Sequence, residues 1–342
     1  MHMSDALLSP VVGGAFWATS AGLIGISARK IATESDGSRT VLMGVLGAFV
    51  FAAQMINFSI PGTGSSGHIG GGLLLAVLLG PWRAFVTLSS VLVIQALFFA
   101  DGGLLSLGCN IFNLAFFPAF IMMPLIYKPI AGDGSSGGRL AVGCILAAAA
   151  GLLAGALSVV LETTTSGISD LPFRTFVLFM LPIHLAIGAI EGLLTWGVLS
   201  FVLRTEPALL AEARKTTGSS SRFVPLVFLF AALATGGILS WFASKDPDGL
   251  EWSIAKVTGK QELASPSGAS SELLGGLQRK LAFMPGYGFR HPEGSGSPTA
   301  ADASHLNAET SVSGLLGSIL VLVVSGAAGL ILRKHSEKSA TC

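Results

Sequence analysis

The sequence predicts an all-α integral membrane protein, a polytopic bundle of nine helices arranged as a group of seven followed by a group of two. Of its 342 residues 51% are apolar and only 11% are charged, whereas about a quarter of the residues in a soluble domain are charged. Long apolar runs approach the ~20 residues that a helix needs to cross a bilayer. Basic residues also collect beside alternate runs, as they do in proteins that cross a membrane repeatedly.

The apolar segments can be placed in order along the chain. Ser9 suits a helix N-cap and Pro10 the first helical position, where its missing N–H costs nothing. The third segment has only 12 residues and could fuse with the fourth across "LLGPWRAF". The predicted spans are 10–28, 41–58, 69–80, 84–100, 108–127, 140–162, 174–203, 223–242 and 312–332.

The distribution of basic residues decides whether segments 69–80 and 84–100 form one fused helix or two helices with a break between them. With a break at Pro81 and the amino terminus outside, 13 of the 20 basic residues fall on one side of the membrane. Six of the other seven lie in one long loop, which the positive-inside rule hardly counts. We therefore expect a multi-pass protein of the cytoplasmic (inner) membrane, with the amino terminus outside and the carboxy terminus in the cytoplasm. Close helix contacts are expected at the pairs Gly151/Gly155 and Gly188/Gly192, unless these only reflect the general glycine enrichment of membrane helices.

A polar stretch, "RTEPALLAEARKTTGSSSRF", divides the chain into two parts. The predicted domains are 1–205 with seven helices, a cytoplasmic linker at 206–222, and 223–342 with two helices joined by an external loop at 243–311. Two sections of this loop, "SKDPDGLEWSIAKVTGK" and "LLGGLQRKLAFMPGYGFRHP", are dense in apolar and aromatic residues and are expected to be ordered.

The opening residues carry a possible metal chelate. A histidine at position two offers the amine of Met1, the amide of His2 and its imidazole, which close a five-membered and a six-membered ring around one ion. Loss of an amide proton favours Ni(II), Cu(II) and low-spin Co(II). The amine must be free, and "MHMSDALLSP" shows neither the basic nor the apolar region of a signal peptide. The alternative is that a histidine stands at position two by accident.

The chelate fills three corners of a square, and a fourth nitrogen is needed. In "NFSIPGTGSSGHIGGG", His68 follows a glycine-rich loop that could fold inward. Neutral imidazole binds these metals well. The alternative for His68 is a polar loop residue at the membrane interface.

Four ordered motifs resemble a known family. "MH" at the start, "IPGTGSSGHIGGGLLLAVLLGP", "QALFFADGGLLSLGCNIFNLAF" and "HLAIGAIEGLLT" resemble the CbiM/NikM family, the substrate-binding (S) components of energy-coupling factor (ECF) transporters for cobalt and nickel. The second part, with "DPDGLEWSIAKVTGK" and "KLAFMPGYGFRHPE", resembles the companion subunit CbiN/NikN, here fused to the first. The seven helices are then of S-component type and the last two belong to the companion.

The resemblance implies a metal site made of the Met1 amine, the His2 amide and imidazole, and His68. It implies Co(II) or Ni(II) as the transported substrate, without an organic cofactor. Its partners are a transmembrane coupling subunit (CbiQ/NikQ-like), ATPase subunits (CbiO/NikO-like) and lipid. Family members commonly begin "MHIPDG", whereas this chain continues with Met3-Ser4-Asp5-Ala6, so the opening loop could be held differently.

Other polar residues within apolar segments are costly in lipid and therefore face protein or a site. Asn57, Ser65, Ser66, Asn110 and Asn113 could fix the imidazole tautomers by hydrogen bonds, or could serve only in helix packing. His184 and Glu191 stand two turns apart on one helix face and could form a polar cluster, a partner contact or a transient metal stop; we favour a structural network.

The sequence also bears on other classes of function. No phosphate-binding loop is present, since "KVTGKQ" lacks its leading glycine and its hydroxyl residue, so energy from ATP must come from other chains. The net charge of +1 gives no sign of nucleic-acid binding, and no enzyme is predicted. The competing hypothesis is an ion-coupled secondary permease that uses His184 and Glu191. A membrane sensor ranks last because the cytoplasmic segments are too short for a signalling domain.

Overall fold

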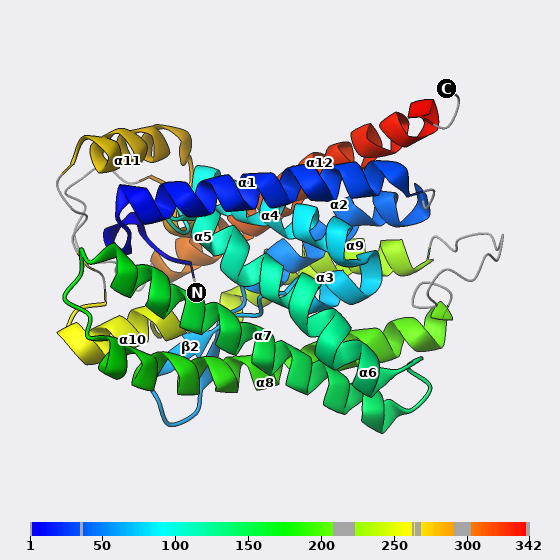
Figure 1. The fold of residues 1–342 in the computed structure, drawn as a ribbon, viewed down its shortest axis with the longest axis horizontal. Coiled ribbons are helices and arrows are strands. Elements are labelled where there is room, and N and C mark those ends of the chain that lie inside the picture. Colours follow the sequence, from blue (N-terminus) through cyan, green and yellow to red (C-terminus); the bar gives the residue numbers. More distant parts are fainter. Residues whose placement is uncertain are drawn as a thin grey trace.

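A computed structural model of the chain describes residues 2–34, 37–207, 223–261, 263, 268–290 and 302–339. The long helices run roughly along the longest axis of the molecule (Figure 1). The amino-terminal segment, α10 and α11 lie toward one end and the carboxy terminus lies at the other. The helices of the first part are η1 Asp5–Leu7, α1 Pro10–Thr33, α2 Gly37–Gln54, α3 Gly72–Leu79, α4 Pro81–Phe98, α5 Leu107–Ile111, the π-helical η2 Phe112–Tyr127, α6 Lys128–Ala131, α7 Gly137–Ser166 and α8 Phe173–Thr205. Those of the second are α9 Phe223–Gly237, η4 Leu239–Phe242, α10 Gly249–Thr258, α11 Ala269–Leu281, η5 Pro285–Tyr287 and α12 Asp302–Ser339.

Each predicted apolar segment contains a helix, and the predicted break at Pro81 is confirmed. Gly80 adopts a φ of 82°, which favours glycine, and Pro81 opens α4. Within the described residues six helices are long and apolar enough to cross a membrane. The eight residues of α3 extend only about 12 Å, well short of the ~30 Å hydrocarbon core. The prediction of nine full spans is therefore not confirmed, although the protein is an all-α membrane protein by its described residues.

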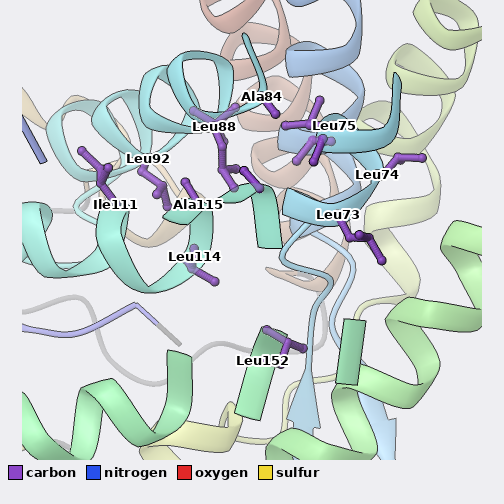
Figure 2. Close-up of a cluster of buried hydrophobic side chains, with 14 of the residues drawn as sticks. Leu73, Leu74, Leu75, Ala84, Leu88, Leu92, Ile111, Leu114, Ala115 and Leu152 are labelled. Atoms are coloured by element: carbon purple, nitrogen blue, oxygen red, sulfur yellow. The ribbon is translucent and has the colours of Figure 1, made fainter. Parts of the chain in front are cut away.

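The core of the bundle is built around α3. This helix is apolar on every side, and all of its residues are buried except the half-buried Val77, as expected for a helix without a polar face. Its leucines, Leu73 to Leu75, belong to the same buried cluster as Leu88 and Leu92 of α4 and Leu114 of η2, part of which is drawn in Figure 2. Helix α3 thus lies at the centre of the bundle, and neighbouring helices surround it and the residues that lead into it.

The glycine contacts predicted on α8 are confirmed. A Cβ atom added at Gly188 would lie 2.6 Å from the Cα of Ala149, and one at Gly192 would lie 2.4 Å from the Cα of Ile145. The backbones of α7 and α8 therefore approach too closely for any larger residue. This contact fixes α8, which carries His184 and Glu191.

The second part packs on the first along α2. Helices α9 and α12 both lie against α2, and a Cβ atom at Gly44 would lie 2.7 Å from the carbonyl oxygen of Leu322. The two loop sections expected to be ordered form α10, α11 and η5. One boundary differs from the prediction, because α12 begins at Asp302, ten residues before the predicted span at 312, and shortens the external loop.

Candidate metal-capture site

A two-stranded hairpin carries His68. Strands β1, Phe58–Ile60, and β2, Ser65–Gly67, pair antiparallel, with Phe58 opposite Gly67. Two glycines with positive φ, Gly62 and Gly64, shape the turn between them. His68 follows β2 directly and leads into α3, so the hairpin places its imidazole at the wall of the bundle.

The amino-terminal segment is held by the start of α5 and the loop before it. The backbone N–H of Met3 donates to Oδ1 of Asn110 at 2.8 Å, and Nδ2 of Asn110 donates back to the Met3 carbonyl oxygen at 3.2 Å. The N–H of Gly103 also donates to that oxygen, at 2.9 Å. Met3 is fully buried. Residue three is therefore fixed in the protein interior, and His2 is anchored next to it.

His2 and His68 meet although they are far apart in sequence. Their rings stack with centroids 5.2 Å apart and planes inclined by 15°. Nδ1 of His2 lies 3.3 Å from Oδ1 of Asp101, and Nδ1 of His68 lies 3.0 Å from the carbonyl oxygen of Ile69. Since a carbonyl oxygen only accepts, His68 carries its proton on Nδ1. Burial lowers the pKa of both imidazoles, so both stay neutral and able to bind a metal.

The two histidines border a cavity between the two parts of the chain, about 510 Å³ in volume. Asp101 of the first part lines it, and the second part contributes Tyr287 and the charged residues Lys245, Asp246, Asp248 and Glu251, so that four acidic side chains stand against one basic side chain. Tyr287 donates its hydroxyl to Oδ2 of Asp101 at 2.6 Å. Burial acts to raise the pKa of the Asp248 carboxyl, but nearby positive charge and donor N–H groups outweigh it and hold this pKa well below its usual range. The wall is thus acidic at neutral pH, as suits a site for cations.

Met1 lies outside the described residues. Asn110 holds Met3, as described above, and Asn113 donates to Oε2 of Glu162 at 2.8 Å. Asn57 lines the cavity, and its carbonyl oxygen accepts from the N–H of Ser244 at 2.7 Å.

Ser65 and Ser66 bind the second part of the chain. The hydroxyl of Ser66 donates to the carbonyl oxygen of Asp246 at 2.7 Å, and that of Ser65 lies 3.4 Å from the carbonyl oxygen of Pro247. The hydrogen bonds of these serines and of Asn57, Asn110 and Asn113 thus join the segments around the histidines rather than the imidazoles themselves.

His184 and Glu191 are both buried on α8, but their hydrogen bonds go to different places. Nδ1 of His184 lies 2.8 Å from the carbonyl oxygen of Met180 in its own helix. His184, His68 and Asp248 also line a water-sized cavity of about 10 Å³. Glu191 accepts from the backbone N–H groups of Gly70 and Gly71 instead.

Three residues of the cavity were missed by the sequence reasoning: Asp101, Asp248 and Tyr287. Asp248 had a usable signal, because "DPDGLE" places an acid and a later glutamate at capping-box spacing, and the structure has that capping box at the start of α10. Among the described residues, no three His, Cys, Asp or Glu side chains converge on a point that could hold a metal.

The chain is similar to known metal transport proteins. Residues 2–209 match the model of the CbiM family, described as the cobalt uptake substrate-specific transmembrane region, and residues 222–334 match the PDGLE domain. A putative metal transport protein of Haloquadratum walsbyi is 36% identical over 211 residues, which cover 61% of this chain and 93% of that protein. The fused nickel transport protein NikMN of Rhodobacter capsulatus is 31% identical over 287 residues, 79% of this chain and 80% of that one.

A solved structure agrees with these relatives. The crystal structure of a transition metal transporter superimposes with a TM-score of 0.54 at 27% identity, and covers 64% of this chain and all of the other. The resemblance predicted from the four motifs is confirmed by the two family models. This multi-pass membrane protein belongs to the CbiM family, with a PDGLE domain fused behind the CbiM region.

Proposed function

We propose that this protein is the metal-capturing component of an uptake system for Co(II) or Ni(II). The observation that carries the proposal is the stacking of His2 on His68 at the wall of an acidic cavity. Two neutral imidazoles that meet although they are 66 residues apart in the sequence, beside a fixed amino-terminal segment, make a nitrogen-rich site for a late transition metal.

The ligands that we propose are the Met1 amine, the His2 amide nitrogen and Nδ1, and one imidazole nitrogen of His68. The six-membered chelate ring requires Nδ1 of His2, so metal binding would displace Asp101 from that atom. The clamp of Asn110 on Met3 supports this set, since it fixes the peptide that follows the chelate. Backbone nitrogens also account for a site without three converging side chains in the described residues.

Transport against a concentration gradient requires energy, and the sequence carries no phosphate-binding loop for ATP. We propose that the chain works in the cytoplasmic membrane as the substrate-specific component of an ECF-type transporter, amino terminus outside and carboxy terminus inside. A transmembrane coupling subunit and ATPase subunits provide the energy. The section that begins "DPDGLEWS" lies at the cavity, where Ser66 of the hairpin before His68 binds Asp246 and pairs with Asp248. In this proposal the section covers the captured ion.

The test is to block the amine. The amine of Met1 is acetylated, and nickel and cobalt bound to the purified full chain are measured by elemental analysis. We expect the metal to be lost from the blocked protein and from His2→Ala, and retained by the matched variant His335→Ala. Stoichiometric metal in the blocked protein would refute the amine as a ligand. Transport that survives His2→Ala but not Glu191→Gln would instead support the ion-coupled permease.

A further inference from the structure

Glu191 holds the backbone that follows His68. Its Oε2 accepts from the N–H of Gly70 at 2.7 Å and its Oε1 from the N–H of Gly71 at 3.0 Å. The side chain is buried, with 3% of its surface exposed. Both carboxylate oxygens are therefore used on two consecutive peptides, beginning two residues after the histidine.

The sequence around Gly71 explains why a carboxylate is needed there. Helix α3 begins at Gly72, and its N-cap, Gly71, has no side chain to satisfy the free N–H groups at the start of the helix. A negative charge at a helix amino terminus is favourable, and N–H bonds to a carboxylate are stronger than those to a neutral acceptor. Glu191 thus satisfies the N–H of the N-cap residue and of the residue before it, and it places a carboxylate from a different helix at the start of α3.

The same peptide is held on its other side. Nε2 of Gln54 donates to the carbonyl oxygen of Gly70 at 2.8 Å, and Gln95 donates to Oε1 of Gln54 at 2.9 Å. Glutamine side chains from α2 and α4 therefore oppose the carboxylate from α8. Residue 70 cannot shift without breaking hydrogen bonds to two helices.

Helix α8 also touches the chain just before His68. A Cβ atom at Gly67 would lie only 2.5 Å from Cγ1 of Ile187, one turn before Glu191 on the same helix. The contacts at Gly67 and at Gly70 enclose His68 from both sides along the chain. Since the close contact of Gly192 with α7 fixes α8 itself, the imidazole is mounted on a rigid support.

We propose that Glu191 is the positioning residue for the His68 imidazole, which it holds where the amino-terminal chelate can reach it. The inference rests on the proposed function, because it assigns Glu191 a role in that same metal site. It gives this buried carboxylate a task other than carrying protons or binding metal. Positioning groups behind metal ligands typically account for about 10- to 100-fold in metal affinity.

The test compares Glu191→Gln with His68→Ala in the purified full chain, with Cu(II) and Ni(II) as probes. A glutamine has one acceptor oxygen, and its NH₂ group would face a backbone N–H, so the clamp is broken with almost no change in volume. We expect Glu191→Gln to lose about 10- to 100-fold in affinity. Its Cu(II) absorption should shift to longer wavelength, as in His68→Ala, because the terminal chelate remains and the fourth nitrogen is lost.

Thr195→Val provides the matched control, since Thr195 is buried one turn further along α8. It should keep the affinity and spectrum of the unmodified chain. Four-nitrogen spectra and full affinity in Glu191→Gln would overturn the inference. So would normal metal binding together with lost transport, which is the behaviour of a proton-coupling carboxylate.

Hydrogen exchange and the His2→Ala variant provide two further measurements. If Glu191→Gln does not fold, hydrogen exchange in the unmodified metal-free chain answers the question: the amides of Gly70 and Gly71 should exchange as slowly as those of the α3 interior, and fast exchange would refute the clamp. His2→Ala separates the two proposals. If His2→Ala keeps its metal, the proposed function fails; if it loses metal while Glu191→Gln does not, only the role of Glu191 fails.

Discussion

The backbone N–H of Ser66 donates to the carbonyl oxygen of Pro247 at 2.8 Å, and Ser66 and Asp248 form a short parallel bridge. The section that contains the PDGLE motif thus adds a third segment to the hairpin that presents His68. Trp252 strengthens the contact by donating from Nε1 to the Thr63 carbonyl oxygen at 3.0 Å. The two parts of the chain meet through backbone groups at the point where the histidines lie.

The first prediction concerns this junction. A Cβ atom at Gly249 would lie 3.1 Å from Cε1 of His184, so Gly249→Leu should push α10 away from α8. We expect the amides of 65–67 to exchange faster with deuterium, because Ser66 loses its acceptor. Lys256→Leu, on the exposed side of the same helix, is the control. Unchanged exchange in Gly249→Leu would show that α10 does not hold the hairpin.

The second prediction concerns the seat of the amino-terminal segment. A Cβ atom at Gly103 would lie 1.8 Å from Oδ1 of Asp5 and 2.6 Å from its backbone nitrogen. Gly103→Ala should therefore displace the segment and lower metal affinity by at least tenfold, about 1.4 kcal/mol. Isothermal titration with Ni(II) measures it. Gly14→Ala is the matched control, since nothing lies within 4 Å of the added atom, and equal affinities for the two variants would contradict the prediction.

The third prediction concerns Asn110, which bonds both the N–H and the carbonyl group of Met3. Asn110→Leu leaves these buried groups with fewer partners, at a cost of about 1–3 kcal/mol in the free energy of unfolding. We expect a lower melting temperature and weaker nickel binding together. Ser90→Ala, whose hydroxyl bonds only the Val86 carbonyl oxygen in its own helix, should change neither. Nickel affinity that stays unchanged in Asn110→Leu would show that the clamp does not serve the site.

The fourth prediction concerns pH. The amine, the amide and the imidazoles bind metal only without their competing protons, so affinity should fall steadily from about pH 8 to pH 5. Because burial lowers the pKa of His2 and His68, they bind protons more readily in the unfolded chain. The free energy of unfolding of the metal-free protein should therefore fall as pH drops below about 6.5. Equilibrium dialysis and thermal melts at each pH measure the two effects, and metal affinity that is flat over this range would contradict the ligand set.

Much of the fold could be predicted from the sequence, because it follows from the lengths of the apolar segments and from residues that begin or end helices. Ser9 caps α1 by accepting from the Val12 N–H, and Pro81 opens α4 as expected. The start of α3 at Gly72 could not be predicted, since residues 69–71 were expected to belong to the helix but form a loop. That choice depends on the positive φ of Gly71 and on Glu191, which lies 120 residues further along the chain.

The candidate site could be predicted in its chemistry but not in its surroundings. His2 and His68 were singled out because the chelate rings depend only on local covalent structure. The roles of Asp101 and Tyr287 depend on how α11 and η5 pack against the end of α4, which no local pattern encodes. Glu191 was noticed as costly to bury, yet its partners are backbone groups, and a sequence shows no backbone contacts between distant segments.

The cavity wall built from two parts of one polypeptide has a kinetic consequence. Tethering gives the section 246–251 an effective concentration near the hairpin on the order of millimolar, so weak contacts suffice to keep it there most of the time. If this section covers a captured ion as proposed, it can open and close again without diffusing away, and entry of an ion would then need no separation of subunits.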